Sequence, residues 1–371
     1  MRIFLSFVVL LAFCADLLTA QRRKRGKKSE EEITQTLEVP KDPPAAVVGD
    51  AQRFLYLNAP LSAKGLLSQQ TRDGLKALRR LAKGATILKI RAFVAGTGDL
   101  RRVQAIVSEE FTDWRAPLPA LTTILVGGLP QEGAQVLLEA IAVEKKPVNP
   151  HGVVLFSGQQ VTSKEPLEKI EPIFRKSLDN LSTAVKGVGI TDADVLRVTC
   201  FSSTLGDHTQ QRQMLVERFP KAAHTIVQVL RGLTTGLVEC EAVGRAAAGS
   251  GGPLKTMNPA GLEASPNYSQ AVILNAPKVI LSGGQMAFRA EPADIRLAFE
   301  RLGKTVEQVG GNLKRTAMTS YYPLATSTID KIRQIRFEYL DKAQPPASTM
   351  LLFEGLPSMD ASFVMEVIAL P

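Results

Sequence analysis

One signature recurs three times along the chain and constrains the fold more than any other feature. Each copy is an apolar run, a glycine-containing turn with leucine, and a second apolar run; the copies begin at Ala120, Ala223 and Ala347. The second run holds one glutamate in every copy: Glu139, Glu241 and Glu366. Self-similarity of this kind is typical of stacked or pseudo-symmetric units. The sequence therefore predicts three copies of one folding unit in a single chain.

The stretch before each signature follows a common plan. Apolar runs bounded by glycine predict strands, and apolar residues that recur every three or four positions predict one face of a helix. The second copy has predicted strands at 152–159 and 195–201 and helices near 170–185 and 209–219. The third has strands at 271–275, 278–285 and 313–321 and helices near 295–306 and 327–340. The first has strands at 54–57 and 86–94 and helices near 75–81 and 99–111.

Each unit is therefore expected to be α+β, of order β-β-α-β-α-β-β, with both helices on one face of its sheet. The units span residues 46–146, 147–244 and 263–371, and a Gly/Ala/Ser-rich linker, 245–262, separates the last two. The closing strands carry apolar residues on both sides rather than in clean alternation. We therefore expect the sheets of the three units to associate with one another.

The N-terminal segment determines the predicted compartment. Arg2 is followed by an apolar run, 3–18, and by small residues before Gln21, which predicts a signal peptide at 1–20 and a secreted or periplasmic protein. The alternative is an uncleaved membrane anchor, because a basic run, 22–28, follows directly and resists translocation. Residues 21–45 are basic and then proline-rich, as in a flexible tether.

Charge and cysteine content narrow the classes of function. The 371 residues carry a formal net charge of +9, of which six positive charges lie in the basic run, and no nucleic-acid-binding motif is present. After the leader only Cys200 and Cys240 remain, each inside an apolar strand-like run. We expect buried free thiols there, with a disulfide as the alternative. Three histidines and two cysteines, widely separated, predict no metal site, and no cofactor is expected.

Several segments resemble the YjgF/RidA superfamily, once labelled endoribonuclease L-PSP. In the third unit YSQAV at 268–272 and ILSGGQ at 280–285 are similar to the opening motifs of that family. In the second unit FSGQ at 156–159, SLDNL at 177–181 and DVLRVT at 194–199 resemble successive family segments. The three signatures resemble the family's closing strands. The resemblance covers nearly the whole chain beyond residue 50.

Members of that family form trimers whose sheets close into a central barrel, with a ligand cleft at each subunit boundary. The resemblance implies three tandem RidA-like (chorismate-mutase-like) units that form an intrachain pseudo-trimer around a central β-barrel. Covalent linkage makes such an association independent of protein concentration, so no homotrimer is needed.

The resemblance also marks the cleft positions. The family's deaminases hold the carboxylate of a 2-imino acid with an arginine early in the first closing strand, because its planar guanidinium makes two parallel hydrogen bonds. The matching residues here are Leu121, His224 (or Thr225, counted back from Leu233) and Ser348, none of them arginine. The family's water-positioning glutamate matches Leu137, Glu239 and Val364, and its tyrosine matches Tyr268 alone.

Two classes of function remain open. We expect a non-catalytic pseudo-trimer that binds a small carboxylate or carbonyl compound between units or has a structural role. The alternative is a divergent imine or enamine deaminase with Glu239 and His224 as catalytic candidates; Tyr268, Glu239 and His224 are the candidate ligand-binding residues. Each also has a structural interpretation: Glu239 as a solvent-facing strand residue, Tyr268 as a packed loop tyrosine and His224 as a structural histidine. RNA cleavage is suggested only by the family's old label.

Overall fold

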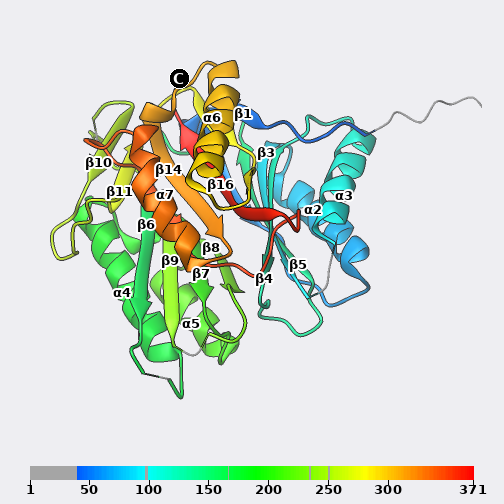
Figure 1. Cartoon of the computed structure of the whole chain (residues 1–371), viewed down its shortest axis with the longest axis horizontal. Helices are drawn as coiled ribbons and strands as arrows, with labels where there is room; N and C mark the ends of the chain where they lie inside the picture. The colour runs from blue at the N-terminus through cyan, green and yellow to red at the C-terminus, as the bar shows by residue number, and fades with distance from the viewer. Residues whose placement is uncertain (1–39, 97–98, 166, 234, 250) are drawn as a thin grey trace, which may run out of the picture. The chain divides into compact units, whose positions relative to one another are not determined.

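Three mixed β-sheets, each with two helices on one face, make up the part of the chain that the computed structural model describes: residues 40–96, 99–165, 167–233, 235–249 and 251–371 (Figure 1). Residues Lys41–Pro371 form one compact unit. The predicted signal peptide and most of the predicted tether lie outside the described residues. No helix in the described ranges is long and apolar enough to cross a membrane.

The first sheet has the order β2-β5-β3-β4. Its strands are β2 (Phe54–Asn58), β3 (Thr86–Ala95), β4 (Ala120–Val126) and β5 (Val136–Val143), and its helices are α2 (Leu67–Ala82) and α3 (Leu100–Asp113). Helix α3 begins where the side chain of Asp99 accepts a hydrogen bond from the backbone N–H of Arg101, as an N-cap residue does.

The second sheet has the order β10-β11-β6-β9-β7-β8. Its strands are β6 (Val153–Thr162), β7 (Val195–Ser202), β8 (Ala223–Gln228), β9 (Leu237–Arg245), β10 (Leu254–Met257) and β11 (Ala271–Leu274), and its helices are α4 (Glu171–Gly187) and α5 (His208–Arg218).

The third sheet has the order β1-β12-β16-β14-β15, and β13 also pairs with β16. Its strands are β1 (Ala46–Gly49), β12 (Val279–Ser282), β13 (Gln285–Phe288), β14 (Thr316–Pro323), β15 (Ala347–Met350) and β16 (Ala361–Ala369), and its helices are α6 (Pro292–Gln308) and α7 (Thr326–Ile335).

The four strands at the centre of each sheet follow one order. The closing strand (β5, β9 or β16) lies antiparallel between the unit's opening and second strands. The third strand (β4, β8 or β15) lies parallel to the second. The predicted α+β class with helices on one sheet face is therefore confirmed.

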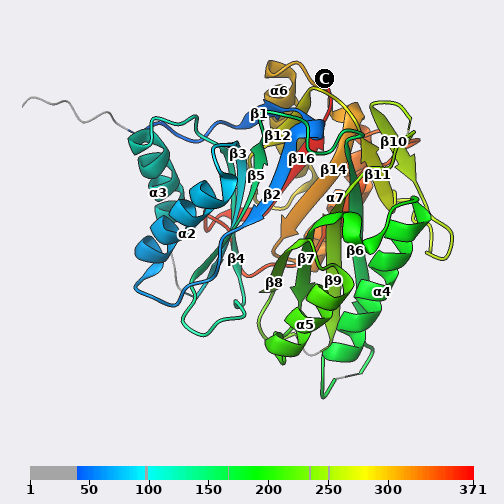
Figure 2. The same ribbon diagram turned by 180° about the vertical axis from the view of Figure 1, so that it is seen from behind.

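Two edge pairings differ from the predicted units. Strand β1, near the start of the described chain, pairs with β12 of the third sheet, and β11 pairs with β6 of the second (Figure 2). The prediction assigned 271–275 to the third unit's own sheet. Local pattern defines a strand, but the sheet edge that it joins depends on long-range packing, which the sequence pattern does not contain.

The strands do not close into the predicted barrel: the described residues form three separate sheets. Only two isolated bridges connect them outside the ladders, Leu125 with Gly355 and Gly128 with Gln228. In each bridge one partner belongs to a turn that follows a signature strand. The chain leaves the extended conformation within one or two residues of the bridge. Ladders between neighbouring sheets therefore stop before a continuous barrel forms.

Apolar side chains fill both faces of each sheet, as predicted. One face packs against helices; on β5, Leu138 and Ala140 belong to the core beneath α2 and α3. The other face packs against the neighbouring sheets. Phe93, Phe201 and Phe353 come from three different units and meet edge to face, with ring centroids 6.0 and 5.7 Å apart. Such contacts join the sheets side chain to side chain.

The two cysteines form a disulfide, which contradicts the expectation of free thiols. Cys200 on β7 and Cys240 on β9 are directly opposite in the antiparallel ladder, with Cα atoms 4.1 Å apart. Both are fully buried in the core under α4 and α5. The apolar runs correctly indicated burial, but cross-strand register is what places the two sulfur atoms side by side.

Candidate functional site

The three recurring glutamates lie buried between the sheets. Glu139, Glu241 and Glu366 have 1%, 1% and 9% of their surface exposed. Alternation along each closing strand directs them away from the helices. On β5, for example, Leu138 faces α2 and α3, whereas Glu139 faces the other sheets. The repeated glutamate therefore lies in the interior between the sheets, where it contributes to their association.

Arg91 on β3 pairs with two of these glutamates. Its Nη2 lies 2.6 Å from Oε2 of Glu139 and 2.8 Å from Oε1 of Glu241. Arg91 is directly opposite Glu139 in the ladder, and the corresponding partners of Glu241 and Glu366 are Thr199 and Ser320. One guanidinium, from the first unit only, thus joins carboxylates of the first and second sheets.

Lys89 and hydroxyl groups satisfy the remaining oxygens. The Nζ of Lys89 lies 2.6 Å from Oε2 of Glu366 and donates to the Thr122 hydroxyl at 2.5 Å. Further hydroxyl donors reach each carboxylate: Thr199 to Glu139, Thr349 to Glu241, and Thr122 and Tyr322 to Glu366. Threonines of one sheet bond to glutamates of another, so the cluster ties all three sheets together.

Two carboxylates of this cluster, Glu366 and Glu139, stay ionised. Burial raises the pKa of Glu366, but Lys89 and Arg91 outweigh it and lower that pKa to about 2. Burial also opposes ionisation of Glu139, yet Arg91 and Arg197 hold its pKa below the usual value. In turn the carboxylates outweigh desolvation of Arg91 and raise its pKa.

A cavity of about 40 Å³ lies within this cluster, and Arg197 is among its lining residues. The Nη1 and Nη2 atoms of Arg197 lie 3.9 Å from carboxylate oxygens of Glu139 and Glu241, and its Nε has no hydrogen-bond partner among the described residues. Such a volume holds a few waters at most. The cluster is an electrostatic core between the sheets rather than a substrate site.

Glu239 and Tyr268, two of the predicted site residues, interact electrostatically. Glu239 is 4% exposed, so it is not a solvent-facing residue, and its Oε2 accepts a hydrogen bond of 3.1 Å from Gln160. Burial, then the charge of Glu241, raises its pKa to about 8. Burial raises the pKa of half-buried Tyr268, and the charge of Glu239 adds to that shift. A carboxyl group that titrates near neutral pH is a feature of functional sites.

His224 lies apart from this pair. It is opposite Val198, which packs under α4 and α5, so its side chain is on the helix face of the second sheet. Glu239 is opposite Phe201, whose ring faces the other sheets. The Nε2 of His224 lies 2.8 Å from the Phe219 carbonyl oxygen, and burial lowers its pKa. A neutral, engaged imidazole does not hold a carboxylate.

The alternative residue at that position, Thr225, faces the sheet interface. It is 1% exposed, and its hydroxyl accepts a hydrogen bond of 2.5 Å from Nδ2 of Asn58 on β2. Its hydroxyl also contributes to the low pKa of Glu139. Thr225 therefore belongs to the junction of the first and second sheets.

A cavity of about 240 Å³ lies between the first and third sheets, beside β4, β13, α3 and α6. Leu121 and Val364, two of the positions that the resemblance marks as arginine and glutamate, are in its wall. The lining also includes the glycine pair of the SGGQ motif, Gly283 and Gly284. Two of the positions that the resemblance marks therefore line this cavity, and none of its lining residues is charged.

A larger cavity, about 490 Å³, lies within the second unit between the starts of α4 and α5. Its carboxylates Glu171 and Asp207 are engaged in local structure. Asp207 caps α5 through the N–H of Thr209, and Glu171 accepts from the N–H of Asp207. These contacts are those of helix capping, whereas the third lining carboxylate, Glu168, is exposed to solvent. In the described ranges no cluster of His, Cys, Asp and Glu side chains suits a metal ion.

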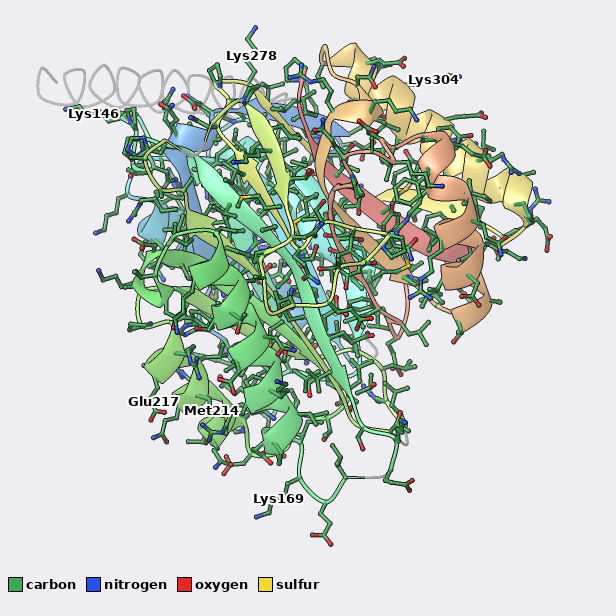
Figure 3. The ribbon with its side chains drawn as sticks, turned by 90° about the vertical axis from the view of Figure 1, so that its left-hand side faces the viewer. Lys146, Lys169, Met214, Glu217, Lys278 and Lys304 are labelled. Atoms are coloured by element: carbon green, nitrogen blue, oxygen red, sulfur yellow. A yellow bond between two sulfur atoms is a disulfide. The ribbon has the colours of Figure 1, made fainter. Side chains whose placement is uncertain are left out.

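The sequence analysis did not identify Lys89, Arg91 and Arg197 as site residues. The signal was present, because Lys89 and Arg91 lie on the same face of an otherwise apolar strand. Two cations in such a strand predict buried carboxylate partners. By contrast, Lys146, Lys169, Lys278 and Lys304 extend outward from the surface (Figure 3), where a charge needs no partner.

No protein-family model and no curated protein matches the sequence. Solved structures of YjgF/Rid proteins match about one third of it. A member of the YjgF family from Neisseria meningitidis is 13% identical over 32% of this chain and 93% of its own, with a TM-score of 0.24. A Rid family protein from Yersinia pestis is 15% identical over 32% and 100%, with a TM-score of 0.29.

A member of the YjgF/YER057c/UK114 family from Mycobacterium tuberculosis is 20% identical over 32% of this chain and 99% of its own, with a TM-score of 0.24. These likenesses concern the fold of one third of the chain.

Proposed function

We propose that the chain is an exported YjgF/RidA-type protein whose three tandem units, 46–146, 147–244 and 263–371, form an intrachain pseudo-trimer. Its role is to bind a small molecule between units or to serve as a structural protein, without hydrolysing imino acids. Support for three units comes from the common strand order of the three sheets and from the equivalent glutamates at their junction.

We infer that catalysis is absent because none of the three positions that match the family's carboxylate-binding arginine has a free guanidinium. Leu121 is apolar, His224 bonds to a backbone carbonyl on the helix face, and Ser348 accepts from the Thr319 hydroxyl at 3.1 Å. Loss of a charged hydrogen bond in a desolvated site costs about 2–5 kcal/mol. That energy corresponds to a rate lower by roughly thirty-fold to several thousand-fold.

Export is supported by the disulfide, since disulfides persist in oxidising compartments and are rare in the cytosol. Mass spectrometry of the protein purified from its native host tests this part. A mature N-terminus near Gln21 together with an oxidised Cys200–Cys240 pair is expected. A retained leader with reduced thiols would contradict it.

The test of function is hydrolysis of freshly generated iminopropanoate, with an active Rid-family deaminase as the positive control. We expect a rate indistinguishable from the uncatalysed reaction. Turnover comparable to the control enzyme would overturn the proposed absence of catalysis.

One observation favours a second function, a hydrolase acting on a C=N bond at the junction of the second and third sheets. Glu239, with a pKa of about 8, can exchange a proton near neutral pH beside Tyr268. If imine hydrolysis is found, Glu239→Gln should abolish it and Tyr268→Phe should weaken it. Unchanged turnover in both variants would exclude this pair from the reaction.

A further inference from the structure

The cavity between the first and third sheets has an uncharged wall in which apolar and polar side chains are mixed. Leu121 of β4, Met286 of β13, Leu302 of α6 and Val364 of β16 line it. Pro44, just before β1, also contributes to the wall. Its volume of about 240 Å³ is slightly below the usual range of ligand pockets, which suits a molecule the size of a substituted benzene.

Five of the lining residues have uncharged polar side chains, and three of these have no side-chain hydrogen-bond partner among the described residues. Gln104 of α3, Thr123 of β4 and Thr305 of α6 line the cavity, and none of them makes a side-chain hydrogen bond to another described residue. Thr123 is 7% exposed, so within the described structure its hydroxyl is enclosed but uncommitted. A ligand that offers one donor and one acceptor would satisfy these groups.

The nearest cation does not make the cavity attractive to an anion. Lys89 donates to the hydroxyl of Thr122, a lining residue, but its Nζ also lies 2.6 Å from Oε2 of Glu366. Its charge is therefore balanced behind the wall. An anion that enters this cavity meets no unpaired cation, so uncharged polar groups replace its lost hydration only in part.

Building on the binding role proposed above, we propose that this cavity takes a small uncharged ligand with both a hydrogen-bond donor and an acceptor, and rejects the matching carboxylate. In this cleft leucine stands at the position of the family's carboxylate-binding cation. The replacement changes the selectivity of the cleft from acids to neutral compounds. Amides and alcohols on a small apolar body belong to this class.

The experiment compares benzamide with benzoate, which have the same size and shape, by calorimetric or NMR titration of the mature protein at pH 7. Benzamide is expected to bind at least tenfold more tightly than benzoate, about 1.4 kcal/mol. Equal or tighter binding of benzoate, or no saturable benzamide binding up to its solubility limit, would overturn the proposal.

Two variants test whether the difference in affinity between benzamide and benzoate arises in this cavity. Leu121→Arg supplies a guanidinium, so benzoate affinity should rise at least tenfold and benzamide affinity should fall. Leu81→Arg places the same charge on the exposed side of α2, where leucine is 45% exposed, and should leave both affinities unchanged. Equal responses to the two variants would contradict the assigned location.

A third variant keeps the test decisive if Leu121→Arg does not fold. Thr123→Val retains shape and removes the free hydroxyl, so benzamide should bind three- to tenfold more weakly with unchanged thermal unfolding. Full benzamide affinity in this variant would argue against the site. Imine hydrolysis is measured separately: a protein that turns over iminopropanoate yet prefers benzamide here would overturn the proposed absence of catalysis and leave this inference standing.

Discussion

Arg91 and Glu241 lie 150 positions apart in the sequence, on different sheets, and form an ion pair of 2.8 Å with 5% and 1% of their side-chain surface exposed. Arg91 is paired with Glu139 in its sheet. At the corresponding ladder positions, opposite Glu241 and Glu366, the other two sheets have Thr199 and Ser320 instead of a cation. The arrangement of cations at the junction of the three sheets is therefore asymmetric. Arg91 makes the shortest contacts to two buried carboxylates, and Arg197 lies 3.9 Å from the same two.

The first prediction concerns removal of that side chain. Arg91→Met leaves Glu139 and Glu241 buried with only Arg197, 3.9 Å from each, as a compensating cation, and loss of one partner of a buried ion pair costs about 3–5 kcal/mol. Denaturant unfolding at pH 7 measures the change. Arg102→Met is the matched control, because Arg102 pairs with Glu109 at the surface and such pairs contribute at most about 1 kcal/mol. Equal losses in the two variants would contradict the role given to Arg91.

The sequence predicted the elements of this fold well and their long-range partners poorly. The signature strands β5, β9 and β16 and the helix faces follow from apolar periodicity, which is a local property. The pairing of β1 with β12 and of β11 with β6 is not local, and nothing in four-residue strands specifies the edge they join.

The site residues, like the fold, could be predicted from local sequence only in part. Motif resemblance, which depends on sequence order, suggested Glu239 and Tyr268 as candidates, and in the structure the charge of Glu239 acts on Tyr268. His224 was grouped with them by position, but strand alternation turns it to the opposite face of the sheet. Arg91 was missed because its partners, Glu139 and Glu241, are brought to it by sheet association rather than by spacing.

The second prediction concerns the disulfide. Cys200 and Cys240 are 40 positions apart in the sequence. In the chain-entropy model, a disulfide that closes a loop of that length stabilises the folded state by about 4 kcal/mol. The double variant Cys200→Ala/Cys240→Ala should lower the free energy of unfolding by about 2–4 kcal/mol. Thermal unfolding with and without reductant gives the same comparison. A reductant effect that persists in the double variant would show that the stabilisation has another origin.

The third prediction is a pH dependence. Since burial raises the pKa of Glu239 to about 8, the folded protein keeps a proton that the unfolded chain loses above its ordinary pKa of 4.5. Glu239 therefore lowers stability progressively as pH rises from about 4.5 to 8, and has no such effect below that window.

Glu239→Gln removes this titration and keeps the shape of the side chain. Relative to the unmodified protein, the variant should gain stability between pH 5 and pH 8, on the order of 2–4 kcal/mol. Denaturant unfolding at several pH values checks it, and all other groups titrate alike in both proteins. A constant difference across this window would mean that Glu239 ionises normally.

The last prediction concerns the close contact between Gly158 and the side chain of Glu239. Gly158 lies beneath it: a Cβ added to Gly158 would lie 1.9 Å from Oε1 and 2.5 Å from Cγ of Glu239. The carboxylate is held by Gln160, so it does not move away freely. Gly158→Ala should therefore destabilise the protein by about 1–3 kcal/mol, the usual cost of overpacking. Gly303→Ala in α6 is the control; its nearest contact is an ordinary 3.5 Å, and helix propensity gains about 0.5–1 kcal/mol there.

A double-mutant cycle separates this contact from general strain. If Gly158 is required because Glu239 occupies the space above it, Gly158→Ala should cost much less in a Glu239→Ala background, with a coupling energy of at least about 1 kcal/mol. Denaturant unfolding of the four proteins gives that value. Additive effects would mean that Gly158 serves the backbone of β6 instead, and that the position of Glu239 is not fixed by the close approach of the two residues.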